Sequence, residues 1–257
     1  MQVVHEVQRA QADLRARADS FGHEAERYDR SRPAYPAALI DDIVGPDPLR
    51  LSVLDVECGT GIASRLLAER GAQVIGVDRN AAMAHIGERH GVTVDIAAFE
   101  EWEPAGCMFD RVTSPQGWHW LDPVVSTAKT APVLHPGGRL CIFWSVGHHP
   151  AGLADALSDA YHRVLPKGGP ILVIGYAANR ERDILPDPGV VTDAVQACNR
   201  LAGLRMRTFT WSRRYTRDQW LDQLMSHSVH ITLDPEMREQ LTDEVGGAID
   251  RAGVRSP

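Results

Sequence analysis

This sequence of 257 residues lacks long apolar runs, paired cysteines and metal-binding histidine patterns. No run approaches the roughly 18 apolar residues that cross a bilayer, and residues 1–20 lack the apolar core of a secretory signal. The four cysteines form no CxxC pair, and neither HxxxH nor HxH occurs. These absences predict a cytoplasmic protein with reduced thiols, and they argue against a disulfide framework or a metal site.

Basic residues are also in deficit, because 27 lysines and arginines stand against 34 aspartates and glutamates, for a formal net charge of −7. This balance opposes nonspecific attraction to a nucleic-acid backbone. Residues 205–217 differ, since arginines and aromatic residues are interleaved there as in a platform for single-stranded nucleic acid. A solvated outer strand is the other interpretation of that segment, and the overall charge favours it. We therefore expect neither nucleic acid nor a membrane as partner.

What the chain has instead is a regular succession of short apolar runs and helical segments, with 44% hydrophobic residues overall. After a mostly helical leader over 1–30, the patterns predict strands at 51–56, 73–78, 92–96, 108–114 and 139–146, and helices at 37–44, 62–70, 81–90 and 123–134. Beyond residue 147 they predict helices at 152–164, 217–226 and 235–251, a strand at 206–215, and a strand or buried loop at 171–174. Such alternation predicts a Rossmann-like, doubly wound α/β fold, whose mostly parallel sheet has helices on both faces.

A glycine-rich turn follows the first predicted strand. Glycine at positions 59 and 61 reaches positive φ freely and has no Cβ to hold a ligand away from the backbone. The helix that begins after Gly61 directs free N–H groups toward a carboxylate or phosphate. Asp78 ends the next strand, where an acid can accept both hydroxyls of a ribose. A nicotinamide cofactor is the alternative ligand, although Ser64 fits the last position of that fingerprint imperfectly.

These residues resemble the first motif of the class I methyltransferases, which use S-adenosyl-L-methionine as cofactor. The family's acid-x-GxGxG is matched by Asp55-Val56-Glu57-Cys58-Gly59-Thr60-Gly61, with Glu57 at the position of the first glycine. The resemblance implies that Asp78 binds the ribose, and that Arg79, Met83, Phe99 and Glu100 surround the adenine. It also implies that Glu57 lies beside the methionine tail, where its charge attracts the ammonium or repels the carboxylate. We expect its Cβ to forbid the positive φ that is open to glycine.

Two further segments resemble one small-molecule subgroup of this family. The leader between Phe21 and Pro36 is similar to the opening of that subgroup, and Gln116-Gly117-Trp118-His119-Trp120-Leu121-Asp122 is similar to its Q-A-[FW]-H-W-[FL]-D segment. We expect Tyr28, Arg32 and Gln116 to contact the cofactor, although Tyr28 could instead be plain packing and Gln116 a solvent-facing loop amide. We also expect one methyltransferase domain over 1–257, with a helical cap at 1–48, a cofactor-binding core at 49–147, a substrate-covering insertion at 148–204 and a C-terminal part at 205–257.

Histidines are the candidates for the general base, because the unperturbed pKa of a histidine is about 6.5. His119 follows the fourth predicted strand, and His148 and His149 follow the fifth. Loops at the carboxyl ends of strands bind ligands in open α/β sheets, although each of these histidines could instead have a structural role. We expect methylation of a hydroxyl on a sugar, polyol or secondary metabolite. The expected substrate residues are Trp118 and Trp120, which could instead be core aromatics, and Tyr176.

Several alternatives stay open. The acceptor could be a small carboxylic acid, a nitrogen or a carbon, and Glu57 leaves a non-catalytic S-adenosylmethionine binder as a further alternative. A metal held by His148, His149 and Asp122 is not expected, because adjacent histidines chelate a single ion poorly. The family's sheet ends in a seventh strand, and none is visible after Ile231. The missing strand would leave a sheet edge exposed, or a partner chain, as in a homodimer, would cover it.

Overall fold

The structure is a computed structural model that describes residues 18–165 and 188–252. Its contacts divide the chain into two compact units, and each is described here by itself. The sheet unit comprises Pro33–Ser145 and Asp187–Ser212, and the helical unit comprises Met1–Arg32, Val146–Pro186 and Arg213–Pro257. None of the helices in the described ranges is long and apolar enough to cross a membrane.

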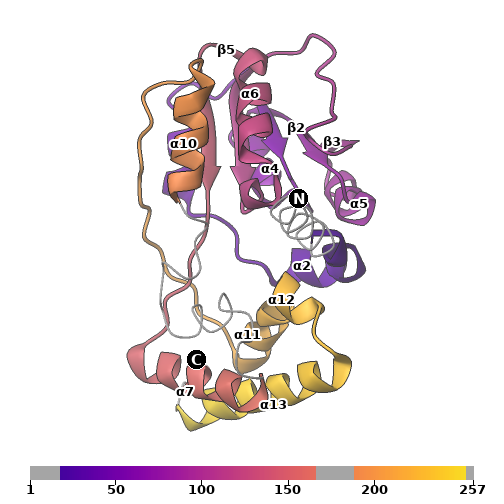
Figure 1. Cartoon of the computed structure of the whole chain (residues 1–257), viewed down its shortest axis with the longest axis vertical. Coiled ribbons are helices and arrows are strands. Elements are labelled where there is room, and N and C mark those ends of the chain that lie inside the picture. The colour runs from indigo at the N-terminus through magenta and orange to yellow at the C-terminus, as the bar shows by residue number, and fades with distance from the viewer. Residues whose placement is uncertain (1–17, 166–187, 253–257) are drawn as a thin grey trace, which may run out of the picture. The chain divides into compact units, whose positions relative to one another are not determined.

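The sheet unit is built on five strands that are all parallel to their neighbours (Figure 1). They are β1 (Ser52–Val56), β2 (Gln73–Asp78), β3 (Thr93–Ile96), β4 (Phe109–Pro115) and β5 (Leu134–Phe143). The strand order is β3-β2-β1-β4-β5, so the chain reverses its direction of winding between β1 and β4. Ligands bind at such a switch point, outside the carboxyl ends of the strands. The predicted Rossmann-like fold is confirmed.

Helices cover both faces of this sheet, as its strands require. They are α3 (Ala37–Val44), α4 (Ile62–Glu69), α5 (Ala81–Arg89), α6 (Pro123–Val133) and α10 (Pro188–Cys198). Successive side chains of a strand point to opposite faces. In β1, Val53 therefore packs in a cluster with residues of α3 and α4, whereas Leu54 and Val56 pack in a second cluster with Trp118 and Val133. In Figure 1, α6 and α10 lie side by side over one face.

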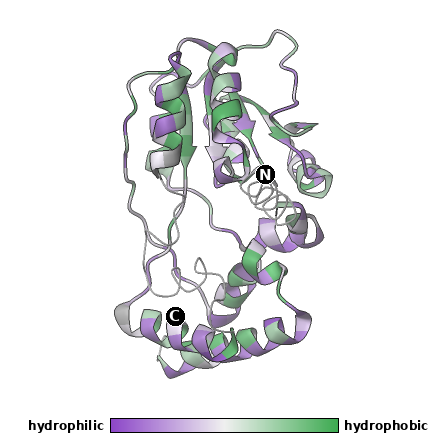
Figure 2. Ribbon diagram, in the orientation of Figure 1, coloured by the Kyte–Doolittle hydropathy of each residue, from purple (hydrophilic) through white to green (hydrophobic). Residues whose placement is uncertain are grey.

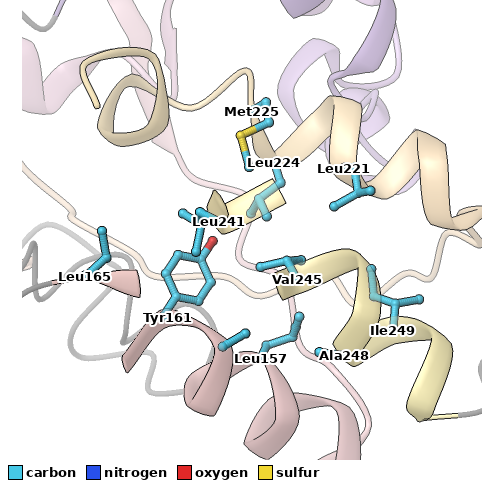
Figure 3. Close-up of a cluster of buried hydrophobic side chains, with 11 residues drawn as sticks. Leu157, Tyr161, Leu165, Leu221, Leu224, Met225, Leu241, Val245, Ala248 and Ile249 are labelled. Atoms are coloured by element: carbon cyan, nitrogen blue, oxygen red, sulfur yellow. The ribbon is translucent and has the colours of Figure 1, made fainter. Parts of the chain in front are cut away.

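The helical unit has its own apolar core. Its elements are the 3-10 turn η1 (Phe21–Glu24) and the helices α2 (Ala25–Ser31), α7 (Ala151–Val164), α11 (Arg217–Leu224), α12 (Ser228–Ile231) and α13 (Pro235–Arg251). Leu157 and Tyr161 of α7 meet Leu241 and Val245 of α13 in this core (Figure 3). Hydrophobic and hydrophilic residues both occur along α7 and α13, which fits helices with one buried and one exposed face (Figure 2).

The predicted strand at 206–215 is wrong, because the structure has no regular secondary structure between residues 201 and 216. Alternation would place Met206 on one face of such a strand and Phe209 and Trp211 on the other, so neither face is continuously apolar. Met206 is 82% exposed, and Arg207 forms an ion pair with Asp42 of α3. The segment therefore gains little by adding to the sheet, and β5 is the edge strand within the described residues.

Other predicted boundaries differ less. The strand expected at 139–146 begins earlier, at Leu134, because the turn at 135–138 lies within β5 as an irregularity in its register against β4. The short helix α12 and the 3-10 helix η2 (Trp118–Trp120) were not predicted. The strand or buried loop expected at 171–174 lies outside the described residues.

Candidate cofactor and active site

The turn between β1 and α4 holds three residues with positive φ. Glu57 has φ +57°, Gly59 +57° and Gly61 +78°. A Cβ at Gly61 would lie 2.9 Å from a methyl group of Val92, so both space and backbone require glycine there. The helix α4 begins after Gly61 without a side-chain cap from that residue. The backbone N–H of Ser64 bonds to Asp55, which leaves the N–H groups of Ile62 and Ala63 at the start of the helix for a ligand. The expectation that a Cβ forbids positive φ at position 57 is wrong, since Glu57 adopts it at a cost of about 1–3 kcal/mol.

Asp55 holds this turn together from inside the protein. It is fully buried and accepts hydrogen bonds from the hydroxyls of Ser64 at 2.5 Å and Thr113 at 2.8 Å. These bonds connect β1 to α4 and to β4. Burial raises the pKa of Asp55 to about 6, although both hydroxyls oppose the shift. Its predicted contact with the cofactor is untested, and the geometry gives it a positioning role.

Asp78 connects the ends of β2 and β1. Its carboxylate accepts the backbone N–H of Gly59 at 2.7 Å and that of Asn80 at 2.8 Å, and the residue is 5% exposed. Burial raises the pKa of Asp78 to about 6, and the hydrogen bonds from the two N–H groups oppose this shift. A carboxylate has about four acceptor sites, so two remain for the hydroxyls of a ribose.

The residues around the turn fit the expected cofactor. The Thr60 hydroxyl is buried and has no hydrogen-bond partner among the described residues, so a polar ligand group would satisfy it. The methyl of Met83 lies 3.4 Å from the position of a Cβ on Gly59, which places an apolar side chain beside the turn. Arg79 is half-buried, whereas Phe99 is fully buried in the core. Glu100 accepts the N–H of Asp122 at 3.2 Å.

Gln116 marks the end of β4, next to the turn of β1. It has φ +58°, and its side-chain amide donates to the carbonyl of Ser145 at 3.2 Å. Its backbone N–H donates to the carbonyl of Phe143 at 2.9 Å, so it joins the ends of β4 and β5. Gln116 and Glu57 are therefore two strained residues at the carboxyl ends of adjacent strands, and such strain clusters at functional sites.

His119 lies in η2, directly after β4. Its Nδ1 accepts a hydrogen bond from the indole N–H of Trp144 at 3.3 Å, and its ring lies 4.3 Å from that of Trp120. An indole N–H only donates, so the neutral imidazole carries its proton on Nε2. In this arrangement Nε2 is the hydrogen-bond donor of the His119 ring. Trp118 is 1% exposed and belongs to the core, which is the placement of a core aromatic.

The remaining site candidates of the described chain lie in the helical unit. His149 packs edge-on against Trp220 with ring centroids 4.8 Å apart, and burial, followed by the charge of His148, lowers its pKa to about 4. The Arg32 guanidinium lies 4.6 Å above the ring of Tyr28. Their contacts with cofactor or substrate stay predictions, and Tyr176 lies outside the described residues.

Several residues of the site carried no signal in the sequence. Ser64 and Thr113 hold Asp55, and Trp144 orients His119. Each contact joins residues from different strands or helices, so only the register of the sheet brings them together. Asp122, considered above as a metal ligand, instead caps the N-terminus of α6. No group of three His, Cys, Asp or Glu side chains within the described ranges could hold a metal ion.

Comparison with known proteins identifies the family. A profile of a methyltransferase domain matches residues 53–138. An uncharacterized methyltransferase of Mycobacterium tuberculosis is 30% identical over 229 residues, which cover 88% of this chain and 84% of the relative. A ubiquinone biosynthesis O-methyltransferase of Xanthomonas axonopodis is 35% identical over 133 residues, which cover 48% of this chain and 55% of the relative. A solved methyltransferase structure from Anaeromyxobacter dehalogenans is 24% identical and aligns over 86% of this chain and 89% of its own, with a TM-score of 0.56.

The first relative is similar over most of both chains, and the solved structure shares the fold. This chain therefore belongs to the class I, S-adenosylmethionine-dependent methyltransferases.

Proposed function

We propose that the protein transfers the methyl group of S-adenosylmethionine to a hydroxyl of a small molecule. The observation that carries the proposal is the turn of β1, in which Asp78 holds Gly59 beside an uncapped helix N-terminus. Asp78 would bind the ribose diol, and the first N–H groups of α4 would bind the carboxylate of the methionine tail. When bound, this cofactor supplies an electrophilic methyl group on a sulfonium.

The chain's own part in the reaction is alignment and proton handling. Alignment of donor and acceptor accounts for up to about 7–11 kcal/mol of barrier reduction, and a placed base for about 10²–10⁴-fold in rate. His119 is the first candidate to contact the acceptor, because it directly follows β4 at the switch point. We expect it to orient a hydroxyl through Nε2–H, and it would accept a proton at Nδ1 only after the bond from Trp144 opens.

His148 and His149 are the other candidates for the base. His148 is exposed, and the lowered pKa of His149 keeps its ring neutral at pH 7 but makes it a weak base. A small-molecule acceptor is supported by the net charge of −7 and by the ion pairs of Arg207 and Arg217 in the otherwise basic 205–217 segment. The name of the Xanthomonas relative is consistent with an oxygen acceptor.

A transfer assay with methyl-labelled S-adenosylmethionine and a panel of small hydroxyl compounds tests the proposal, and any acceptor found then separates the roles of His119. His119→Gln keeps an N–H donor near the place of Nε2 but cannot take up a proton. If His119 only orients the acceptor, the variant keeps kcat within about fivefold, whereas loss of a base costs about 10²-fold or more. Trp144→Phe is the matched control, since it frees Nδ1 without changing the histidine. Absence of transfer to every hydroxyl, with transfer to amines or carboxylates, would contradict O-methylation.

A further inference from the structure

Two residues at the carboxyl ends of β1 and β4 differ strongly in size. Glu57 has a large side chain at the third position of the Asp55–Gly61 turn, and Gly117, directly after the strained Gln116, has none. In the structure they are neighbours. A Cβ added to Gly117 would lie 2.4 Å from Cβ of Glu57, which is closer than real Cβ atoms approach, and 3.2 Å from Oγ of Ser114, which is a tight contact. The side chain of Glu57 therefore occupies the space that an alanine at position 117 would need.

Space alone excludes a side chain at position 117. Gly117 has φ −107° and ψ −31°, a conformation that alanine adopts without strain. Glu57, in contrast, has φ +57°, which disfavours every residue except glycine and, to a lesser extent, Asn and Asp. The strained position is thus occupied by Glu57, which has a long side chain, and the unstrained position by Gly117, which has none. A glutamate kept there despite this cost points to a use for its carboxylate.

Glu57 belongs to the turn proposed above to bind the cofactor. It is partly buried, and its Cβ and Cγ lie against Gly117, which follows the end of β4 at the switch point of the sheet. The ribose-binding acid Asp78 and the N-terminus of α4 occupy the other sides of the same turn. S-adenosylmethionine with its diol on Asp78 and its carboxylate on α4 has two charged groups left, its sulfonium and its α-ammonium. Only the α-ammonium donates hydrogen bonds, and it is attached to the same carbon as the carboxylate that α4 would hold.

We propose that Glu57 is a cofactor-positioning residue whose carboxylate binds the α-ammonium of S-adenosylmethionine, and that Gly117 provides the space for it. The inference rests on the proposed function, because it presupposes this cofactor. A carboxylate–ammonium bond is a charge-assisted hydrogen bond, which contributes more than a neutral one. Glu57 therefore selects for ligands that carry the amino-acid tail.

Calorimetric titration of the full chain tests whether Glu57 binds the α-ammonium. The ligands are S-adenosylmethionine, S-adenosylhomocysteine and 5′-methylthioadenosine, and the last has no amino-acid tail. Glu57→Gln keeps the size of the side chain and removes its charge. It should raise the Kd of the first two ligands about tenfold or more and leave that of 5′-methylthioadenosine within about twofold. Equal changes for all three ligands, or none, would overturn the role of Glu57. Wild-type protein that binds none of the three contradicts the proposed function itself.

A double-mutant cycle, measured by thermal unfolding without ligand, tests whether Gly117 provides the space for Glu57. Gly117→Ala should lower the Tm by about 3 °C or more, because its Cβ meets that of Glu57. In the Glu57→Gly background the same alanine should lower the Tm by less than half as much, since only Oγ of Ser114, 3.2 Å from the added Cβ, then remains close to it. Equal losses in both backgrounds would show that the two positions are not matched. Glu57→Gly alone is the control for the loss of the glutamate itself.

Discussion

Both units of the protein bury ionisable side chains, but they bury opposite kinds. The sheet unit buries Asp55 and Asp78 at the ends of parallel strands, and the helical unit buries His230 against Tyr161 between helices. Burial disfavours the charged form in both places, so it raises the pKa of each acid to about 6 and lowers that of His230 to about 3. The buried acids therefore titrate near pH 6, whereas His230 stays neutral above about pH 4.

The difference in pKa distinguishes the candidate site of the sheet unit from the structural core of the helical unit. The two carboxylates accept hydrogen bonds from a backbone N–H and from a hydroxyl, and these bonds hold the turn between β1 and α4 in place. An ionised carboxylate can also accept the hydrogen bonds of a diol. The hydroxyl of Tyr161 lies 2.7 Å from Nε2 of His230, and the positive charges of Arg238 and Arg32 further oppose protonation of the ring. A permanently neutral histidine in an apolar cluster supports packing and carries no catalytic charge.

The comparison predicts opposite pH dependences of stability, and His230 should show the larger one. Its pKa falls from 6.5 to about 3 on folding, so its contribution to stability is complete above pH 6.5 and is lost as the pH falls. His230→Gln does not titrate. The free energy of unfolding of the variant, relative to wild type, should therefore rise by about 3 kcal/mol between pH 6.5 and pH 4. Urea unfolding at both pH values measures this, and a constant difference would mean that His230 is not buried as a neutral ring.

Asp55 should show the opposite pH dependence of stability. Its pKa rises from 3.8 to about 6 on folding, so its contribution is complete below pH 3.8 and is lost as the pH rises through 6. Asp55→Asn removes the titration. Relative to wild type, the variant should gain about 2 kcal/mol in unfolding free energy between pH 4 and pH 7. A relative loss over that range would reverse the sign and place an ionised, well-solvated Asp55 in the folded state.

Tyr161→Phe should have the smallest effect and sharpens the assignment of the helical unit as structural. The change removes one buried hydrogen bond to His230 and should lower the unfolding free energy by about 1–2 kcal/mol. The affinity for S-adenosylmethionine should stay within twofold, because the bond lies within the core of the helical unit. A large loss of affinity in a variant that remains folded would place this core at the cofactor.

The sequence predicted most closely those elements whose ends are encoded locally. The helix at 37–44 matches α3 because Gly45 ends it with φ +77°, and Asp122-Pro123 begins α6 as a side-chain cap followed by proline. The strand predicted at 206–215 was wrong because the prediction relied on alternating polar and apolar residues, and this alternation gives neither face of the segment a continuous apolar surface. In the site, the glycine turn and Asp78 were predictable from spacing. Trp144 and Gly117 were not, since only the register of β1, β4 and β5 defines their neighbours.

The role of Asp78 tests the account most directly, through calorimetric binding of S-adenosylmethionine at pH 7 and pH 5. With a pKa of about 6, Asp78 is mostly ionised at the first pH and mostly protonated at the second. Wild-type affinity should therefore fall about tenfold at pH 5. Asp78→Asn should bind about 50-fold or more weakly at pH 7 with little further change at pH 5, and the exposed Asp47→Asn should match wild type. Wild-type affinity in Asp78→Asn would contradict a cofactor held at this turn.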